Sequence, residues 1–463
     1  MKTFKLNATS LAAALLCVSG TVAMADVPDP THDFRTPSAE KVELGRVLMF
    51  DKILSGNENI SCGTCHHSLA DTGDGLSLPV GEGGKGLGVT RNVSAGTADE
   101  IVERVPRNAP PVFNLGDESF HTFFHDGRVT TVGGKKFPSG CKTPAGQNLP
   151  DNLENVLACK AMFPVTSATE MAGQLGENSV ADAAAAGNLA GPGGVWEQLA
   201  QRLQNNPEYV DMFIAAFPKG KNHVNKASDI TYAHAANAIS AFEGVAWRAD
   251  NSPFDQYIRG DEGAMSDNAK AGMDLFYGGD GNQACADCHS GLYQTDLSFH
   301  AIAMPQIGSG RGSNSPGKTG GHEDFGREQV TGDPDDTLKF RTPTLRNVAL
   351  TAPYGHGGAY DKLRAIVEHH MDTVGSLYAY NSNRQAILPT HPTLDAENYA
   401  AMDDPDRVDF IAAHNELDPF NYSAEDVDRI LDFLNALTDQ GTIDLRSDQD
   451  VVNGVPSGLP LDD

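Results

Sequence analysis

The sequence predicts a mainly α-helical protein with two domains and long loops. Two observations lead to this fold class. The pattern C-x-x-C-H occurs once in each half of the chain, and apolar residues recur at helical spacing in several segments, whereas alternating strand patterns are sparse. The length of 463 residues and a hydrophobic content of 40% suffice for about two or three domains, each with its own core.

The two C-x-x-C-H motifs are Cys62-Gly63-Thr64-Cys65-His66 and Cys285-Ala286-Asp287-Cys288-His289. This is the attachment pattern of a c-type haem, in which both cysteines form thioethers to the porphyrin and the histidine binds the iron. A zinc site would need four ligands grouped nearby, and the directly adjacent histidine is not typical of a zinc or dithiol motif. The sequence therefore predicts two covalently bound haem c groups in two cytochrome c-like domains.

The first 25 residues have the features of a secretory signal peptide. Two early lysines precede an apolar run, and Ala23-Met24-Ala25 forms a cleavage site of small residues. We therefore expect export to the periplasm. No later stretch approaches the roughly eighteen apolar residues of a membrane-spanning helix. An oxidising compartment also favours a disulfide between Cys141 and Cys159, the remaining cysteines of the exported chain.

The chain after the signal peptide divides into three expected parts. The first domain is expected at residues 26–250, the second at 251–445, and an acidic, extended or disordered tail at 446–463. Helices are expected at residues 38–50, 195–217, 230–247, 267–276, 361–371 and 423–438. Two glycine-rich matches to nucleotide-binding patterns, at residues 81–86 and 312–319, lie in loops without a flanking strand and helix and are rejected.

The formal net charge of the chain is −28. Such a charge disfavours nucleic acid and anionic membranes as partners, and it would steer a basic redox protein toward the surface. An acidic surface that serves only solubility explains the charge equally well.

Several longer motifs resemble the bacterial di-haem cytochrome c peroxidase family, which includes MauG. They are LGRVLMFDKILSGNENISCGTCH at 44–66, RNAPPVFN at 107–114, HDGR at 125–128, TEM at 169–171, DLF at 274–276, FRTPTLRNVALTAPYGHGG at 340–358 and LRAIVEHHM at 363–371. They run in the family's order and cover nearly all of residues 40–375.

The resemblance implies roles for several residues beyond the haem motifs. Glu170 resembles the family's active-site carboxylate, a catalytic base beside the N-terminal haem that binds peroxide. Asn108, with the backbone carbonyls of Thr351 and Pro353, resembles the family's interdomain calcium ligands, and oxygen-only ligation suits that ion.

Two departures from the family concern the N-terminal haem. In typical members a histidine in the loop after the first motif caps this iron, but here Glu82 stands at the corresponding place, so we expect an open haem. The tryptophan expected before D-G-R, which lies between the haems, is replaced by His125, a candidate catalytic residue that could bridge them by packing or hydrogen bonding. His67 directly follows the proximal ligand and is expected to be solvated.

The distal ligand of the C-terminal haem is the third departure. The family places methionine or tyrosine where this chain has His370, with Met371 next as the alternative ligand. Imidazole in place of thioether should lower the reduction potential of this haem. His356 resembles the family's motif histidine near the second haem, and a satisfied core histidine is the equal alternative.

The resemblance thus implies a periplasmic di-haem peroxidase that reduces hydrogen peroxide to water with electrons from a small cytochrome c or cupredoxin. One alternative is a MauG-like oxidase that matures a partner protein by oxidation. A non-catalytic electron-transfer cytochrome is a third alternative, which the presence of Glu170 disfavours. The oligomeric state stays open, with a homodimer as one alternative.

Overall fold

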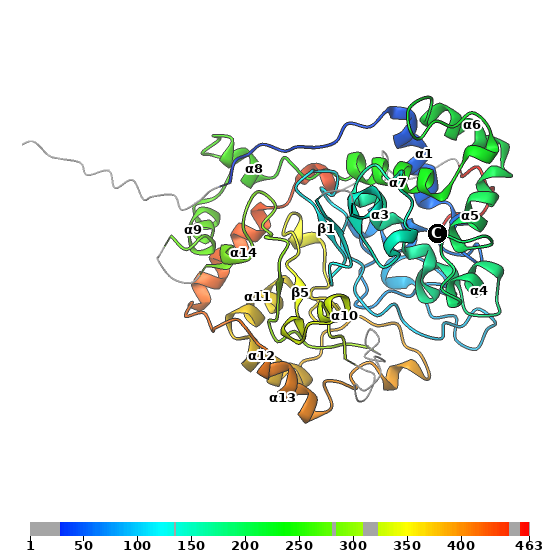
Figure 1. Cartoon of the computed structure of the whole chain (residues 1–463). Helices are drawn as coiled ribbons and strands as arrows, with labels where there is room; N and C mark the ends of the chain where they lie inside the picture. Colours follow the sequence, from blue (N-terminus) through cyan, green and yellow to red (C-terminus); the bar gives the residue numbers. More distant parts are fainter. Residues whose placement is uncertain (1–27, 134–135, 280–283, 309–322, 444–453, 463) are drawn as a thin grey trace, which may run out of the picture.

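The computed structural model describes residues 28–133, 136–279, 284–308, 323–443 and 454–462. The expected signal peptide and the rejected nucleotide pattern at 312–319 lie outside these residues. Helices predominate over strands, as the sequence predicts (Figure 1). The strands form a three-stranded antiparallel sheet of β1 (Thr122–Phe123), β2 (Val129–Thr131) and β3 (Cys141–Lys142), and a pair of β4 (Phe299–His300) with β5 (Phe340–Arg341). Within the described ranges, every helix is too short or too polar to cross a bilayer.

The N-terminal half is built around helices α1 and α7. Its helices are α1 (Ala39–Phe50), α2 (Cys62–Cys65), α3 (Val156–Ala161), α4 (Ser179–Ala185), α5 (Val195–Gln204), α6 (Pro207–Ala216) and α7 (Tyr232–Ala246). The Ser38 side chain caps α1 by accepting a hydrogen bond from the backbone of Lys41. Gly45 of α1 lies so close to α7 that an added Cβ would be 1.9 Å from the carbonyl oxygen of Ala238. The two helices therefore pack backbone to backbone. Phe50, the last residue of α1, lies against Gly63 of the first motif.

The single helix expected at 195–217 is two helices, α5 and α6. Asn206 accepts hydrogen bonds from the backbone of Glu208 and Tyr209, and Pro207 occupies the first helical position. An N-cap followed by proline starts a new helix, because proline cannot donate the hydrogen bond that would continue the old one.

The C-terminal half packs around α9 and α14. Its helices are α8 (Pro253–Ile258), α9 (Asp267–Phe276), α10 (Glu328–Thr331), α11 (Leu363–Met371), α12 (Thr373–Ala379), α13 (Pro405–Ala413) and α14 (Ala424–Ala436). The predicted N-cap of α14 is confirmed, since Ser423 accepts a hydrogen bond from the backbone of Asp426. A Cβ on Gly272 of α9 would lie 1.8 Å from the carbonyl oxygen of Arg429, so these two helices also meet at a glycine.

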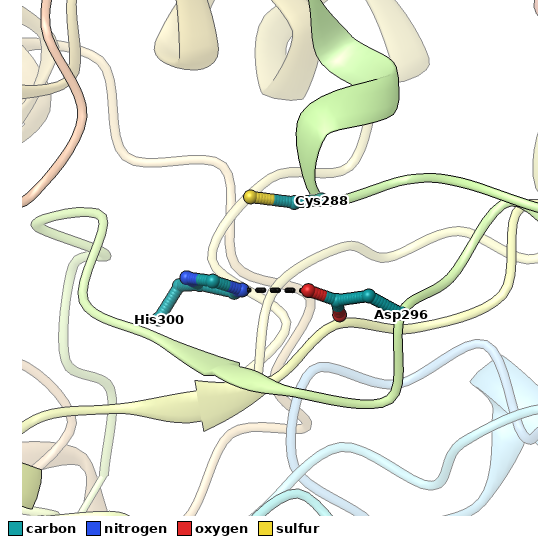
Figure 2. A group of neighbouring side chains, drawn as sticks. All are labelled: Cys288, Asp296 and His300. Atoms are coloured by element: carbon teal, nitrogen blue, oxygen red, sulfur yellow. Dashed lines mark hydrogen bonds and ion pairs between the residues drawn. The ribbon is translucent and has the colours of Figure 1, made fainter.

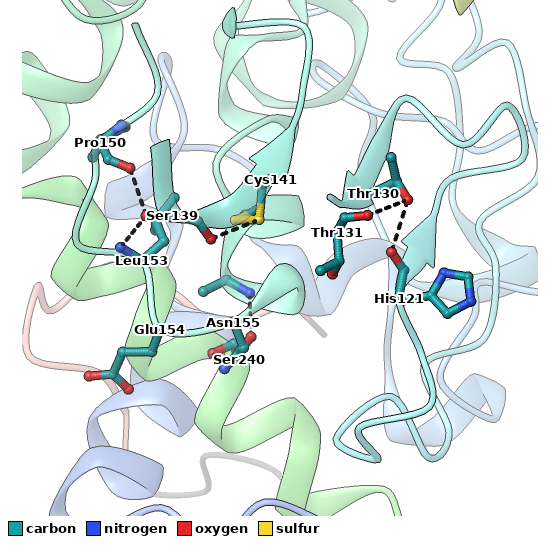
Figure 3. Close-up of a disulfide and its surroundings, with 12 residues drawn as sticks. His121, Thr130, Thr131, Ser139, Cys141, Pro150, Leu153, Glu154, Asn155 and Ser240 are labelled. Atoms are coloured by element: carbon teal, nitrogen blue, oxygen red, sulfur yellow. Dashed lines mark hydrogen bonds between the residues drawn. A yellow bond between two sulfur atoms is a disulfide. The ribbon is translucent and has the colours of Figure 1, made fainter. Parts of the chain in front are cut away.

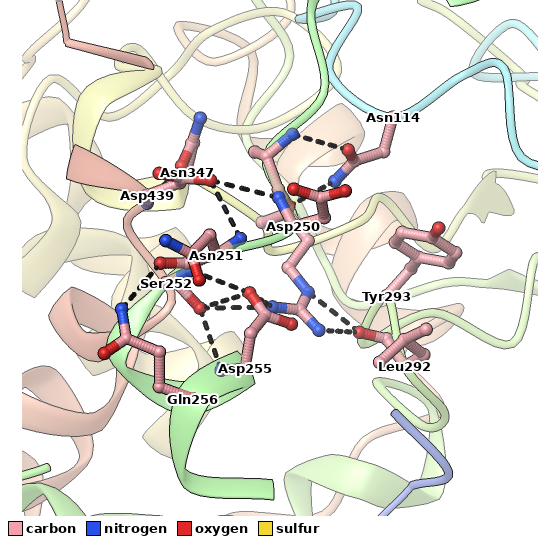
Figure 4. Close-up of polar contacts among 12 residues, drawn as sticks. Asn114, Asp250, Asn251, Ser252, Asp255, Gln256, Leu292, Tyr293, Asn347 and Asp439 are labelled. Carbon is pink, nitrogen blue, oxygen red and sulfur yellow. Dashed lines mark hydrogen bonds and ion pairs between the residues drawn. The ribbon is translucent and has the colours of Figure 1, made fainter. Parts of the chain in front are cut away.

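Most buried apolar side chains belong to two large clusters. The first is drawn from residues 44–249 together with Tyr293, Leu297 and Val455, and the second from residues 254–437 together with Leu78. The chain passes from one cluster to the other at 250–253, where Asp439 accepts hydrogen bonds from the backbone of Asp250 and Asn251 (Figure 4). The passage between the halves is thus fixed by polar contacts.

The predicted disulfide between Cys141 and Cys159 is present and joins β3 to α3 (Figure 3). Both cysteines are buried. The bond fixes α3 against the small sheet, and the next residue of α3, Lys160, lines the cavity described below.

The described part of the acidic tail, residues 454–462, has no helix or strand, but it is docked on the N-terminal half rather than disordered. Its apolar residues pack against the N-terminal core, and the Ser457 hydroxyl donates to Asp51 at 2.7 Å. Asp462 pairs with Lys52 at 2.9 Å and accepts a hydrogen bond from the hydroxyl of Thr64, inside the first motif. The tail thus brings a carboxylate acceptor to a buried lysine and a buried hydroxyl of the N-terminal half.

Candidate functional site

The first C-x-x-C-H motif forms the short helix α2. Ser61 and Thr64 cap it, with the backbone N–H of Ser61 donating to the Thr64 hydroxyl at 2.9 Å. His66 follows directly, and its Nδ1 lies 3.1 Å from the carbonyl oxygen of Thr72. Burial lowers the pKa of His66 to about 3, so the ring is neutral. A neutral ring that donates from Nδ1 leaves Nε2 free to bind a metal.

A cavity opens over this motif. Cys62, Cys65 and His66 line it together with Glu170, His125 and Met171. Glu170 lies on a turn of π-helix, Ala168–Ala172, whose first residues are held by the Ser167 side chain. The negative charge of Glu170 contributes to the raised pKa of both Cys62 and Cys65, although burial is the main cause. The sequence-predicted carboxylate and the attachment residues therefore share one cavity.

Glu82, at the place of the family's capping histidine, is not among the described residues that line this cavity. It lines a neighbouring polar hollow, is 8% exposed, and its Oε1 accepts hydrogen bonds from Asn57 and Asn59 at 2.7 Å each. Two amide donors thus hold this carboxylate outside the cavity.

The expectation that His67 is solvated is wrong, since the residue is buried. Its ring packs edge-on against Phe50, and its Nδ1 accepts from the backbone of Leu69. The imidazole caps a short turn and fills space behind the motif.

His125 lines the cavity from the side of the C-terminal half. Its Nε2 lies 3.1 Å from the carbonyl oxygen of Asn108, and its own carbonyl accepts from the backbone of Arg341 at 2.8 Å. Burial and the nearby charge of Arg107 lower the pKa of His125 to about 3. The ring is therefore a neutral hydrogen-bond donor at the contact between the halves.

The second motif brings two histidine rings close together, one inclined edge-on to the other. The ring centroids of His289 and His370 are 6.2 Å apart, and their Nδ1 atoms lie 3.1 and 2.8 Å from the carbonyl oxygens of Gln294 and Ile366. Two imidazoles bound to one metal ion from opposite sides, with nitrogen–metal bonds of about 2 Å, place their centroids roughly 6 Å apart. Both Nε2 atoms are left free, so the donor set and spacing fit a haem iron.

Cys288, Asp296 and His300 also cluster, with their ligand atoms within 4.8 Å of one another (Figure 2). His300 Nε2 lies 3.0 Å from Asp296. A cysteine that has become a haem thioether offers no thiolate, so this group does not need a metal ion of its own.

The expected calcium ligands lie in two segments that contact each other. The backbone N–H of Asn108 donates to the backbone carbonyl of His356 at 2.8 Å. His356 is close in sequence to Thr351 and Pro353. The Asn108 amide Nδ2 donates to the carbonyl of Leu76 at 2.8 Å, which leaves its Oδ1 as a potential ligand. His356 itself stacks on Phe340 at 3.7 Å between centroids.

Three features of the site are not predicted by the sequence. Arg107 is buried between Asp126 and Asp324, at 2.6 Å from each, and so joins the two halves. The other two are the buried pair Lys160–Glu243 and the guanidinium of Arg341, all of which line the cavity. The motifs around Arg107 and Arg341 were visible in the sequence, but their partners lie far away along the chain.

Comparison with known proteins identifies the family. Residues 39–263 match the model of the di-haem cytochrome c peroxidase family. The methylamine utilization protein MauG of Methylorubrum extorquens is 29% identical over 350 residues, or 74% of this chain and 72% of that protein. The N-terminal half of the chain thus matches the di-haem cytochrome c peroxidase family, and relatives named for that activity extend the similarity over about three quarters of the chain. Cytochrome c551 peroxidase of Pseudomonas aeruginosa is 28% identical over 74% of this chain and 75% of its own length, and cytochrome c peroxidase Ccp of Escherichia coli is 30% identical over 71% and 52%.

Solved structures share the di-haem peroxidase fold. A MauG-like protein associated with microbial copper homeostasis has a TM-score of 0.56 at 24% identity, covering 92% of this chain and 98% of that one. The diheme peroxidase BthA from Burkholderia thailandensis has a TM-score of 0.55 at 18% identity, covering 90% of each chain. The protein is thus a cytochrome-c-peroxidase-like oxidoreductase that acts on peroxide, and its di-haem family implies two haem c groups.

Proposed function

We propose that the protein reduces hydrogen peroxide to water in the periplasm at a haem held by the first motif, with electrons from a small cytochrome c or cupredoxin. The observation that carries this proposal is the cavity that Glu170 shares with Cys62, Cys65 and His66. The retention of Glu82 by two asparagines, outside that cavity, supports a haem that is open to peroxide without prior rearrangement.

The protein groups around the cavity have distinct tasks in this proposal. Bound haem iron supplies the redox chemistry. Glu170 takes the proton from the incoming peroxide oxygen and returns it to the departing oxygen. The His125 ring is already committed as a donor to the carbonyl of Asn108 in the same half, so it is not assigned the transfer of this proton.

In this proposal His289 and His370 would hold a second haem, which would supply the entry route for electrons. The opposed rings and their carbonyl-bound Nδ1 atoms favour His370 over Met371 as the distal ligand. We further propose calcium at Asn108, Thr351 and Pro353, which elemental analysis of the purified protein tests directly. A calcium content well below one ion per chain would exclude this site.

Turnover of peroxide with reduced cytochrome c tests the function. Glu170→Gln should lower the rate by about 10²- to 10⁴-fold while both haems are retained, because general acid–base assistance contributes that much. Glu177→Gln is the matched control, since Glu177 lines the polar hollow rather than the cavity. An unchanged rate in the Glu170 variant, or equal losses in both, would contradict the assignment.

A MauG-like oxidase that matures a partner protein is the second candidate. The similarity to MauG favours it, and so does the close pair His289–His370, because two imidazoles give a lower potential than a methionine ligand. Peroxide consumption that requires a partner protein, with no turnover of reduced cytochrome c, would select this candidate.

A further inference from the structure

Four cationic side chains line the cavity of the first motif: Arg107, Arg128, Lys160 and Arg341. Buried cations are costly unless an anion compensates them. A haem brings two propionate carboxylates into its site, and a cation of the cavity that lacks a carboxylate partner in the chain is available to them.

Two of the arginines are compensated by carboxylates of the chain. Arg107 lies between Asp126 and Asp324, and Arg128 pairs with the same Asp126 at 3.1 Å. Two guanidinium groups thus face two carboxylates, and this cluster carries no excess positive charge.

Lys160 lies near the cysteines of the motif, at the edge of the site where the thioethers form rather than at the propionate edge. It lies 3.9 Å from Glu243, and both charges act on the thiol of Cys62, so the pair is close to the cysteine. The thioether positions and the propionates are on opposite edges of a porphyrin. Lys160 therefore serves the attachment edge, and its charge is balanced there by Glu243.

Arg341 is the exception. Its Nε donates to the carbonyl of Phe124 at 3.2 Å and its Nη1 to the carbonyl of Thr342 at 3.0 Å, and among the described residues no carboxylate forms an ion pair with it. Burial lowers the pKa of Arg341 to about 10, and Asp296 offsets this only in part. A backbone hydrogen bond from its N–H to the carbonyl of His125, at 2.8 Å, and the pairing of β5 with β4 fix its position at the cavity.

We propose that Arg341, a residue of the C-terminal half, is the positioning residue that binds a propionate of the N-terminal haem. This inference rests on the proposed haem site at the first motif. It assigns a haem propionate as the anionic partner of the Arg341 guanidinium. A haem carboxylate supplies the charge that the guanidinium lacks, and the guanidinium fixes the edge of the haem that faces the second half.

The test compares three variants by spectroelectrochemical titration of the holoprotein. Arg341→Met removes the charge but keeps an unbranched side chain, and Arg341→Lys keeps the charge. Arg327→Met is the matched control, because Arg327 also reaches from the C-terminal half to backbone carbonyls of the same loop, at Asp126 and Gly127, yet it is not among the cavity-lining residues.

Loss of a cation beside a propionate favours the more positive ferric state. The midpoint potential of the N-terminal haem should therefore fall in Arg341→Met, stay close to wild type in Arg341→Lys and Arg327→Met, and leave the C-terminal haem unchanged. An unshifted N-terminal potential, or equal shifts of both haems, would overturn the proposal. If Arg341→Met retains no haem, Arg341→Lys decides: near-normal potential and haem content support the proposal, and loss of haem there too refutes it. Because the readout is a potential, absent peroxide turnover in the wild type would refute the proposed function alone.

Discussion

Replacement of Arg346 by methionine removes one partner of a fully buried ion pair at the start of the C-terminal half. Arg346 Nη1 lies 2.8 Å from Asp255, and both side chains have 0% exposure. The same guanidinium bonds the Ser252 hydroxyl at 3.3 Å and the Leu292 carbonyl at 2.8 Å. It thereby joins α8 to the segment that follows the second motif.

The cost of this change follows from the burial. Methionine fills most of the volume, so the lost packing is small. Asp255 keeps Ser252 and, at 3.8 Å, His32, but it loses its buried arginine, and breaking a buried ion pair costs about 3–5 kcal/mol. Exposed pairs are worth at most about 1 kcal/mol. Arg364→Met is the control, because Arg364 and Asp428 are 47% and 59% exposed.

The pH dependence gives a second, independent signature. Hydrogen bonds from His32 and Ser252 and the charge of Arg346 lower the pKa of Asp255 to about 2, from 3.8 in an unfolded chain. The wild-type contribution is therefore present above pH 4 and is lost as the pH falls toward 2. Without Arg346 the carboxyl can be neutralised at low pH, so the penalty of the variant should shrink between pH 7 and pH 4.

Chemical denaturation followed by circular dichroism at both pH values measures these effects. We expect a clearly lower midpoint for Arg346→Met at pH 7 and a near-normal one for Arg364→Met. A penalty of the same size in both variants, or one that grows toward pH 4, would refute the reasoning.

Two further predictions concern the haems. The N-terminal haem should be high-spin in the protein as isolated, because Glu82 is held outside the cavity; electron paramagnetic resonance would disprove this with two low-spin signals and no peroxide reaction before half-reduction. His370→Ala should convert the C-terminal haem to high-spin while Met371→Ala leaves its spectrum unchanged, and the opposite pattern would move the distal ligand to Met371.

The helices were predictable where local signals agree. Ser423 and the apolar spacing that follows it predicted α14, and the predicted helix 267–276 coincides with α9. The break between α5 and α6 is not predicted, because the apolar helical periodicity continues across Asn206. The signal for the break is the N-cap Asn206 followed by Pro207.

In the site too, residues in contiguous motifs are predictable from the sequence, whereas long-range contacts are not. The haem motifs are contiguous in the chain, so their residues could be named from the sequence. The burial of His67 depends on where Phe50 comes to rest, and the partners Arg107 and Asp324 are 217 positions apart. Such contacts arise from tertiary packing, which short-range patterns do not encode.

The docked tail has a consequence for the order in which the protein matures. Asp462 and Thr64 are 398 positions apart, yet they bond at the first haem motif. During synthesis the motif emerges long before residue 462, so its surroundings stay incomplete until that residue has been made. The N-terminal half is thus synthesised first, but its contacts around the first motif are completed only after the tail has docked.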